Sequence, residues 1–242
     1  LGIRLCIDEF TPKGYTIDDG IEYAKIINSY VDYINTDYGN WESMDRTLPS
    51  LNYEQGLHLN AIARIKKAVS VPVIASGRII HPEMAEGVLK DGIADMVGMA
   101  RELIAEPYWV RKIETGDTDE IVECIGCNQK CIGRLLQNRA ISCVVNPAAG
   151  FEEQFSRDIL FGKSRSSKKV AVVGGGPAGM KAAEIAARKG HKVILFEKSN
   201  ELGGRVKMES ALPKKEELAG TSRYLKYALK KLNVDVRLNK IA

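Results

Sequence analysis

The sequence lacks any apolar run approaching the roughly 20 residues that cross a bilayer, and no basic-plus-apolar signal segment opens it. We therefore expect neither a membrane protein nor a secreted one, and we place the protein in the cytoplasm. Aromatic residues make up only 7% of the 242 residues, and Lys and Arg are not massed between aromatics, which argues against nucleic-acid binding. What remains is the composition of an ordinary globular protein, with 45% hydrophobic and 27% charged residues.

Charge is unevenly distributed along the chain. Residues 1–150 carry a net charge of −6, whereas residues 151–242 carry +10. This imbalance suggests two units, and the length suits one to two domains. The chain also begins in one strand-like run and stops just after another, so we expect a fragment of a longer protein.

Short apolar runs alternate with helical patterns through residues 1–106, which is typical of a parallel sheet with crossover helices. Thr16 and Asp19 fit a variant of the capping box at the start of the first helix. Four strand–helix units fit half of a (β/α)8 barrel, although a doubly wound sheet would also fit the alternation. The predicted strands are 3–7, 31–35, 71–75 and 95–99, and the predicted helices are 17–29, 57–70 and 82–90.

Regular periodicity fades between residues 114 and 169, and residues 162–169 have the composition of an exposed connector. A new α/β pattern follows it, in the order expected for the opening half of a doubly wound nucleotide-binding sheet. Its predicted elements are a strand at 170–173, a Gly-rich turn, a helix at 177–189, a strand at 192–197, a helix at 213–232 and a strand at 234–238.

The Gly-rich turn has the spacing of a dinucleotide fingerprint. Gly174, Gly176 and Gly179 fit G-x-G-x-x-G, with Pro177 and Ala178 before the third glycine. The first glycine permits a tight turn, the second lets backbone approach a pyrophosphate, and the third allows close helix–strand packing. The helix N-terminus adds N–H donors for an anion. We predict that these five residues bind a nucleotide cofactor.

An acidic residue and a second glycine pair extend this fingerprint. Glu197 follows Gly174 by 23 residues, at the end of the next strand, where a carboxylate can accept hydrogen bonds from an adenosine ribose. Gly203, Gly204 and Arg205 come shortly after it, at a spacing that resembles the second glycine pair of flavoprotein FAD-binding domains. This resemblance, paired with the first motif, favours FAD or another ADP-containing cofactor over NAD. A plain turn is the alternative for this glycine pair.

Four of the five cysteines are clustered, as Cys124-x2-Cys127-x3-Cys131-x11-Cys143. In a chain without a secretory signal, such a cluster indicates a metal site before disulfides. Structural zinc most often uses two C-x2-C pairs, whereas three close cysteines and a distant fourth suit a [4Fe-4S] cluster. We therefore favour [4Fe-4S] over zinc and disulfides. Cys6, in an apolar strand, is interpreted as a small packed residue.

Two strand ends in the first half finish with a small residue and an arginine, Gly77-Arg78 and Ala100-Arg101. The loops after strands seven and eight of a parallel barrel commonly bind a phosphate, to which arginine adds charge-assisted hydrogen bonds. The matching positions favour a phosphate site, with surface salt bridges as the alternative.

Arg4 lies inside the first strand, where a cation is costly without a partner. Its partner is either a flavin, whose reduced anion a cation stabilises, or a carboxylate, Asp8 or Glu9. The residues alone do not decide between the two. The polar and aromatic loop 35–42 lines a substrate pocket or is a folded surface loop. His58 and His81 are interpreted as helix-entry residues, and no catalytic residue is assigned.

Together these motifs resemble the iron–sulfur flavoenzymes of the Old Yellow Enzyme-like group: 2,4-dienoyl-CoA reductase, enoate reductase and trimethylamine dehydrogenase. The resemblance implies the C-terminal half of an FMN-binding (β/α)8 barrel over residues 1–120. A [4Fe-4S] segment and linker would follow over 121–168, and the first part of a Rossmann-like FAD- or ADP-binding domain over 169–242. Arg4 would face the flavin pyrimidine edge, and the residues that would bind the FMN phosphate are Gly77, Arg78, Ala100 and Arg101. The motifs that carry the resemblance are 71–79, 94–101, 124–131 and 174–179.

The resemblance also implies an activity, the NAD(P)H-dependent reduction of an activated C=C bond in a small-molecule substrate. Electrons would pass from FAD through the [4Fe-4S] cluster to FMN. An amine dehydrogenase or demethylase that exports electrons to a carrier protein is the alternative, and a zinc-stabilised nucleotide-binding module is a third. The dienoyl-CoA reductase has a histidine where this chain has Asn40 or Trp41, which argues against a dienoyl-CoA substrate. We expect a homo-oligomer without nucleic-acid or membrane partners.

Overall fold

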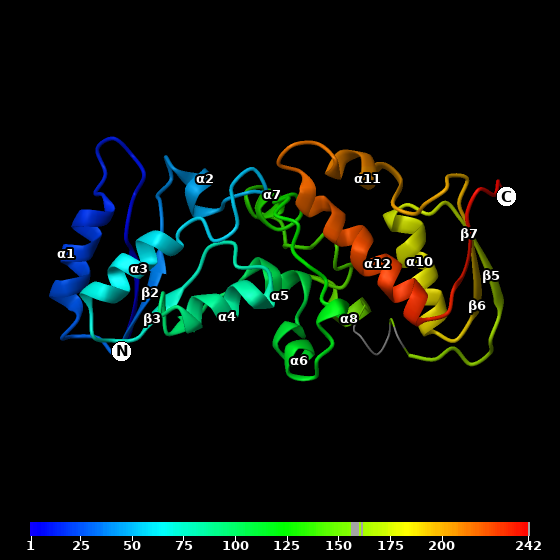
Figure 1. Cartoon of the computed structure of the whole chain (residues 1–242), viewed down its shortest axis with the longest axis horizontal. Helices are drawn as coiled ribbons and strands as arrows, with labels where there is room; N and C mark the ends of the chain where they lie inside the picture. The colour runs from blue at the N-terminus through cyan, green and yellow to red at the C-terminus, as the bar shows by residue number, and fades with distance from the viewer. Residues whose placement is uncertain (156–159, 161, 242) are drawn as a thin grey trace. The chain divides into compact units, whose positions relative to one another are not determined.

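The computed structural model describes residues 1–155, 160 and 162–241, which divide into two compact units (Figure 1). The N-terminal unit is Leu1–Glu102 and the C-terminal unit is Leu103–Ala242. Every helix within the described residues is too short or too polar to span a lipid bilayer.

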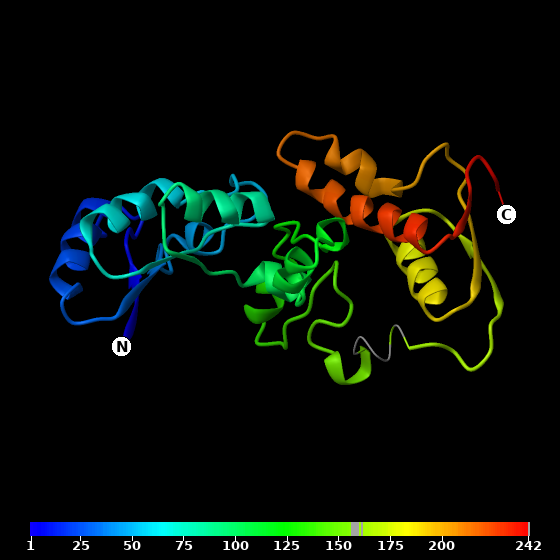
Figure 2. The same ribbon diagram turned by 60° about the horizontal axis from the view of Figure 1, so that its bottom comes forward.

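The N-terminal unit contains a parallel four-stranded sheet in the order β1-β2-β3-β4. Right-handed crossovers between neighbouring parallel strands place α1, α3 and α4 on one side of the sheet (Figure 2). This succession is the predicted half of a (β/α)8 barrel. Its strands are β1 (Gly2–Cys6), β2 (Tyr33–Asp37), β3 (Val73–Ala75) and β4 (Met96–Val97), and its helices are α1 (Ile17–Ile27), α2 (Met44–Thr47), α3 (Leu59–Ala68) and α4 (Pro82–Lys90). The helix α5 (Arg101–Ala105) contains the boundary between the two units in the sequence.

The two faces of this sheet differ in burial. One row across the strands consists of Ile3, Ile34 and Val73, and the next consists of Arg4, Asn35, Ile74 and Met96. Ile34 and Val73 are fully buried, whereas Met96 is exposed. Because side chains alternate along a strand, the first row points toward the helices and the second toward the opposite side. We call this opposite side the inner face, because it corresponds to the interior of a barrel.

The helix starts in this unit follow the sequence. The backbone N–H of Thr16 donates to the Asp19 carboxylate at 2.8 Å, so the predicted capping box at the start of α1 is confirmed. His58 and His81 are the N-cap residues of α3 and α4, as predicted. The short helix α2 was not predicted.

The C-terminal unit ends in a second parallel sheet, with the order β5-β6-β7. Connections that advance in one direction across a parallel sheet place α10 and α12 on the same face of it. The elements before this sheet are α6 (Trp109–Glu114), η1 (Thr118–Glu120), α7 (Ile132–Leu135) and α8 (Glu152–Phe155). Those that form it and cover it are β5 (Lys169–Val173), α10 (Pro177–Arg188), β6 (Lys192–Phe196), α11 (Gly204–Ser210), η2 (Glu216–Leu218), α12 (Ala219–Lys231) and β7 (Asp235–Arg237).

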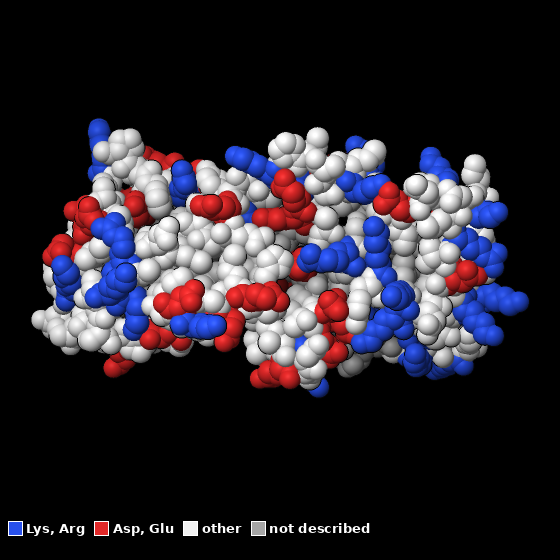
Figure 3. Space-filling model, viewed as in Figure 1, with Lys and Arg blue, Asp and Glu red and all other residues white. Residues whose placement is uncertain are grey.

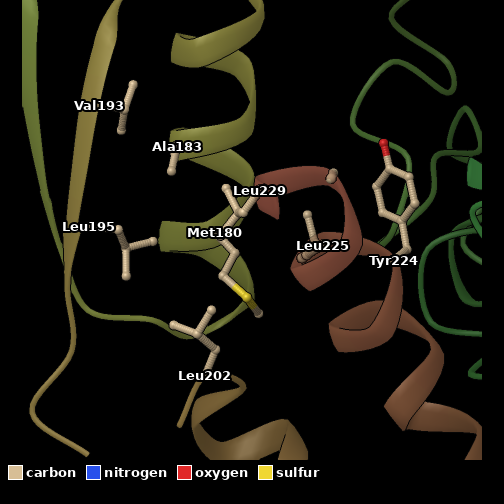
Figure 4. Packing of buried hydrophobic residues seen from close by; sticks show 9 residues of the cluster. Met180, Ala183, Val193, Leu195, Leu202, Tyr224, Leu225 and Leu229 are labelled. Atoms are coloured by element: carbon tan, nitrogen blue, oxygen red, sulfur yellow. The ribbon is translucent and has the colours of Figure 1, made fainter. Parts of the chain in front are cut away.

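A buried apolar cluster fixes these helices on the sheet (Figure 4). Met180 of α10, Leu195 of β6 and Leu229 of α12 are each at most 1% exposed. Such burial is the dominant favourable term in folding. The cluster thereby holds the start of α10 against the ends of the strands.

The sequence-based elements of this unit need one boundary correction and several additions. The helix expected from residue 213 starts at Ala219, after the 3₁₀ turn η2, and α11 was not predicted. The segment 114–169 also contains the short helices α7 and α8. Residues 162–169 are exposed, as predicted for a connector.

Lys and Arg gather over the part of the C-terminal unit that carries β5–β7 (Figure 3).

Candidate functional site

The Gly-rich turn joins β5 to α10, at the carboxyl edge of the C-terminal sheet. Gly174 has φ +100°, and Gly176 is the N-cap of α10 with Pro177 at its first position. A Cβ on Gly179 would overlap the carbonyl oxygen of Gly174, so only glycine allows this close approach of helix and strand. A Cβ on Gly174 or Gly176 would meet no atom within 4 Å. Backbone on this side of the turn is therefore open to a ligand.

Glu197 follows β6 and binds this turn. One carboxylate oxygen accepts the backbone N–H of Gly175 at 2.6 Å, and the other accepts the N–H and the hydroxyl of Ser199 at 2.8 and 2.5 Å. The bonds from Ser199, and then that from Gly175, lower the pKa of Glu197. The carboxylate is thus ionised at neutral pH and lies beside the turn. Its role toward a ribose stays a prediction.

The second glycine pair packs directly on the first turn. The N–H of Gly203 donates to the carbonyl of Gly175 at 2.9 Å, and a Cβ on Gly204 would lie 3.1 Å from the Cα of Gly176. Both glycines have positive φ, +127° and +54°. The turn that they make leads into α11, on which the Arg205 side chain is exposed. The structure therefore brings the two predicted glycine motifs together.

The four clustered cysteines lie half-buried in the C-terminal unit and form no disulfide. Cys124, Cys127 and Cys143 pack against one small apolar cluster, made of Ala105, Ile125 and Val145. No three His, Cys, Asp or Glu side chains among the described residues are arranged to hold a metal ion. The [4Fe-4S] site therefore stays a prediction.

The pKa values of two of these thiols are raised, in part by the other cysteines of the cluster. Burial raises the pKa of Cys127, and the charges of Cys131 and Cys143 raise it further. Burial also raises the pKa of Cys143, again with a contribution from Cys131. Backbone N–H groups point at both sulfurs, from Gln129 to Cys127 and from residues 144–146 to Cys143, and favour their thiolate forms. A soft donor set with N–H groups directed at its sulfurs fits an iron–sulfur cluster.

The two predicted arginines of the N-terminal unit converge on one loop. Gly77 and Arg78 follow β3 with φ +115° and +53°, and Arg101 follows β4. The Arg78 side chain is only 3% exposed and donates to the carbonyls of Ser50 and Tyr53. Arg101 donates to the carbonyl of Pro49 at 2.7 Å. The structure brings these strand ends together, but both guanidinium groups bind loop 49–53.

Arg4 has a carboxylate partner that differs from those expected. Its Nε donates to Asp37, at the end of β2, at 2.9 Å, whereas the sequence analysis named Asp8 and Glu9. The parallel register places Arg4 opposite Asn35, so Asp37 lies two residues further along the neighbouring strand on the same face. The Arg4 side chain is 66% exposed on the inner face. The flavin partner expected for it stays a prediction.

The loop after β2 is partly ordered by aromatic packing. Tyr38 stacks on His58 with ring centroids 3.6 Å apart, and a Cβ on Gly77 would contact the same imidazole at 3.1 Å. Burial lowers the pKa of His58, so this histidine is neutral near pH 7. Asn40 caps the turn by accepting the N–H of Glu42 at 2.8 Å. Trp41, in contrast, is 83% exposed, and the role of this loop in a substrate pocket stays a prediction.

A buried ionic network lies between α10 and α12. The carboxylate of Glu184 is fully buried and accepts from Lys181 Nζ at 2.6 Å, Arg188 Nε at 3.0 Å and the Tyr224 hydroxyl at 2.5 Å. These three donors also line a hollow of about 280 Å³. Because the donors are engaged by Glu184, we interpret the network as structural.

Sequence reasoning missed two residues that shape these sites. Asp37 was noted only as part of a polar loop, and Ser199 was not singled out. Asp37 could have been found by pairing the first two predicted strands in parallel, because it lies opposite Cys6 at the end of that ladder. No sequence signal identifies Ser199, because its contact with Glu197 depends on the turn after β6.

Comparison with known proteins agrees with both parts of the chain. Residues 1–120 match the model of the NADH:flavin oxidoreductase / NADH oxidase family, and residues 169–219 match that of the FAD dependent oxidoreductases. An NADH oxidase of Thermoanaerobacter brockii is 41% identical over 98% of this chain and 36% of its own length. An N,N-dimethylglycine/sarcosine dehydrogenase of Chromohalobacter salexigens is 35% identical over 98% of this chain and 35% of its own length.

Among solved structures, a 2-naphthoyl-CoA reductase in complex with 2-naphthoyl-CoA matches with a TM-score of 0.92 and 32% identity. The match covers 99% of this chain and 36% of that one. The chain therefore spans about a third of the length of the relatives that it matches.

Proposed function

The chain belongs to the NADH:flavin oxidoreductase / NADH oxidase family, and from this premise we propose that it is part of an NAD(P)H-dependent ene-reductase. The proposed cofactors are FMN, FAD (or ADP) and a [4Fe-4S] cluster, bound by residues 1–120, 169–242 and 121–168 in that order. When bound, these groups would supply electron transfer from NAD(P)H and hydride delivery to an activated C=C bond. The protein's own residues bind and orient them.

The observation that carries the proposal is the paired glycine site of the C-terminal unit. Gly174 and Gly176 present open backbone at the start of α10, and the Gly203–Gly204 turn packs beside them. A pyrophosphate fits this open backbone because helix N-terminal N–H groups and the helix dipole favour an anion. In the proposal, Glu197 accepts hydrogen bonds from the adenosine ribose, and Arg205 interacts with the phosphates.

Residues of the N-terminal unit support an FMN site. Gly77 and Arg78 form a turn with positive φ angles just after the carboxyl end of β3, the end at which (β/α)8 barrels commonly bind a phosphate. In the proposal this turn, with Ala100 and Arg101 after the next strand, holds the FMN phosphate. Arg4, on the inner face, places a positive charge beside the flavin pyrimidine edge.

The cysteine segment, residues 124–143, would hold the cluster through Cys124, Cys127, Cys131 and Cys143. The donor set supports this assignment, since all four thiols are half-buried and outside any disulfide. The apolar cluster around Ile125 would limit access of water to the sulfurs.

Anaerobic titration of the complete natural polypeptide tests the proposal. We expect NADH or NADPH to bleach the flavin absorbance, and a cinnamate-type enoate to restore it. Iron and acid-labile sulfide should be present in the same preparation. A colourless protein containing zinc and no flavin would instead indicate the zinc-stabilised nucleotide-binding module.

A second candidate is an amine dehydrogenase or demethylase that passes electrons to a carrier protein. The dehydrogenase of Chromohalobacter salexigens, whose name refers to N-methylated glycines, favours it through its 35% identity. Bleaching of the flavin absorbance by dimethylglycine, with no response to NADH or NADPH, would establish this candidate and remove the first.

Sedimentation of the same preparation would test the expected homo-oligomer.

A further inference from the structure

The inner face of the half-barrel contains one ion pair, Arg4–Asp37, that the phosphate and glycine sites do not explain. Arg4 lies in the middle of β1, with a side chain that is 66% exposed. Within the described residues, Asp37 supplies the single hydrogen bond that the structure gives to this guanidinium, through Nε at 2.9 Å. Among the described residues, the structure gives no hydrogen bond to the terminal nitrogens of Arg4, which are the groups that could serve a bound ligand.

Asp37 is fixed where it can direct Arg4. It ends β2, its Cα pairs with that of Cys6, and its carbonyl accepts the N–H of Ile7 at 2.9 Å. The carboxylate therefore extends from backbone that the strand ladder holds in place. A hydrogen bond between charged groups is shorter and stronger than a neutral one, so it restrains a long, flexible side chain effectively.

The direction of this restraint matters. Arg4 pairs in register with Asn35, and Asp37 lies two residues nearer the carboxyl end of the sheet. The ion pair therefore tilts the guanidinium toward that end. In (β/α)8 barrels the carboxyl ends of the strands and the loops after them form the active site.

We propose that Asp37 is a positioning residue, which holds Arg4 by its Nε edge so that its terminal nitrogens meet the pyrimidine edge of a bound flavin. This inference rests on the FMN-binding function proposed above. Asp37 acts through Arg4 and does not itself touch the flavin. Its loss leaves Arg4 exposed without a described partner, so the guanidinium spends less time beside the flavin.

Sulfite binding reads out the charge at this edge without requiring turnover. Sulfite donates its sulfur lone pair to N5 of oxidised flavin, and the anionic adduct carries its added charge at the pyrimidine edge. A cation there stabilises the adduct. In the complete natural polypeptide loaded with FMN, we expect Asp37→Ala to weaken sulfite binding roughly tenfold, as for partial loss of one charge–charge contact.

Matched variants separate positioning from other effects. Asp37→Asn keeps an oxygen acceptor for Nε and should bind sulfite at least as tightly as wild type, whereas Asp37→Ala should bind it more weakly. Arg4→Ala should weaken binding by more than Asp37→Ala, and adding Asp37→Ala to it should change nothing further. Asp18→Ala removes the carboxylate of another Asp–Arg pair, Asp18–Arg64 on the helix side, and should leave the sulfite affinity unchanged.

The outcomes distinguish this inference from the proposed function. A natural polypeptide that retains no FMN would overturn both. If FMN binds normally and the sulfite affinity of Asp37→Ala is within twofold of wild type, only the positioning role is overturned. An Asp37→Ala effect that persists undiminished in the Arg4→Ala background would also overturn it, because Asp37 would then act independently of Arg4. Thermal unfolding of each variant, followed by circular dichroism, identifies any variant that fails to fold.

Discussion

The two parallel sheets build their candidate sites from different materials. In the C-terminal unit the site is made of backbone, and its glycines are required by steric contacts such as that of Gly179 with the Gly174 carbonyl. In the N-terminal unit the site depends on side chains, above all Arg4 and Arg78, whose directions are set by residues distant in sequence. A backbone site is therefore specified locally, whereas a side-chain site is specified by the tertiary fold.

The largest expected effect tests the backbone site. Gly179→Ala should destabilise the C-terminal unit by about 3 kcal/mol, because its Cβ would meet backbone that cannot move without parting α10 from β5. Trp109 is 6% exposed in this unit, so its fluorescence during guanidinium unfolding, in a Trp41→Phe background, measures the change. Gly176→Ala is the matched control: its Cβ meets open space, so it should reduce cofactor affinity without this loss of stability.

The second largest effect on stability is expected from the side-chain site of the N-terminal unit. Arg78→Ala removes a buried guanidinium that holds the carbonyls of Ser50 and Tyr53, at an expected cost of about 2 kcal/mol. Hydrogen exchange of the amides of residues 49–53 should rise in this variant. Arg101→Ala, which removes a bond from a less buried side chain to the same loop, should raise it less. Equal exchange in the two variants would contradict a special role for Arg78.

A pH effect should appear in the C-terminal unit. Burial alone would raise the pKa of Glu184, but Lys181, Tyr224 and Arg188 together lower it. Because the folded-state pKa is lowered, the stabilisation is present above the unfolded pKa of about 4.3 and is lost as pH falls through the folded value. Each unit of lowering corresponds to about 1.4 kcal/mol.

Urea unfolding of wild type and Glu184→Gln between pH 3 and pH 7 measures this effect, again with Trp109 as the probe. The difference in the free energy of unfolding between the two proteins should become smaller as the pH is lowered. A difference that stays constant over this range would show that the charge of Glu184 does not contribute.

The smallest expected effect is a gain in the N-terminal unit. Gly87 lies inside α4, where a Cβ would meet no atom within 4 Å. Gly87→Ala should stabilise the unit by about 0.5–1 kcal/mol, because alanine restricts the unfolded chain and favours helix. Thermal unfolding followed by circular dichroism checks it. A loss of stability would mean that this glycine, like Gly179, has a packing role.

Much of the fold could be predicted because its signals are local. Alternating apolar runs located the seven strands of the described residues to within a few positions, and Thr16 and Asp19 located the start of α1. The start of α12 was misplaced because residues 213–218 have helical composition, whereas the structure has a turn there that ends in the 3₁₀ helix Glu216–Leu218. The helix α11 was missed because it begins inside the Gly203–Gly204 turn.

The candidate sites were predictable to different degrees for the same physical reason. Glycine spacing identified the turn at Gly174 directly, since each glycine meets a local steric need. The partner of Arg4 was wrong because only nearby carboxylates, Asp8 and Glu9, are visible in sequence, whereas strand pairing brings in Asp37. The burial of Arg78 also depends on a loop 25 or more residues before it.

The Gly-rich turn is braced on both sides of residue 175. Glu197 binds the N–H of Gly175, and Gly203 binds its carbonyl. The shape of the turn is thus set by the chain itself, so the nucleotide of the proposed function would meet a preorganised surface and little conformational entropy would be lost on binding.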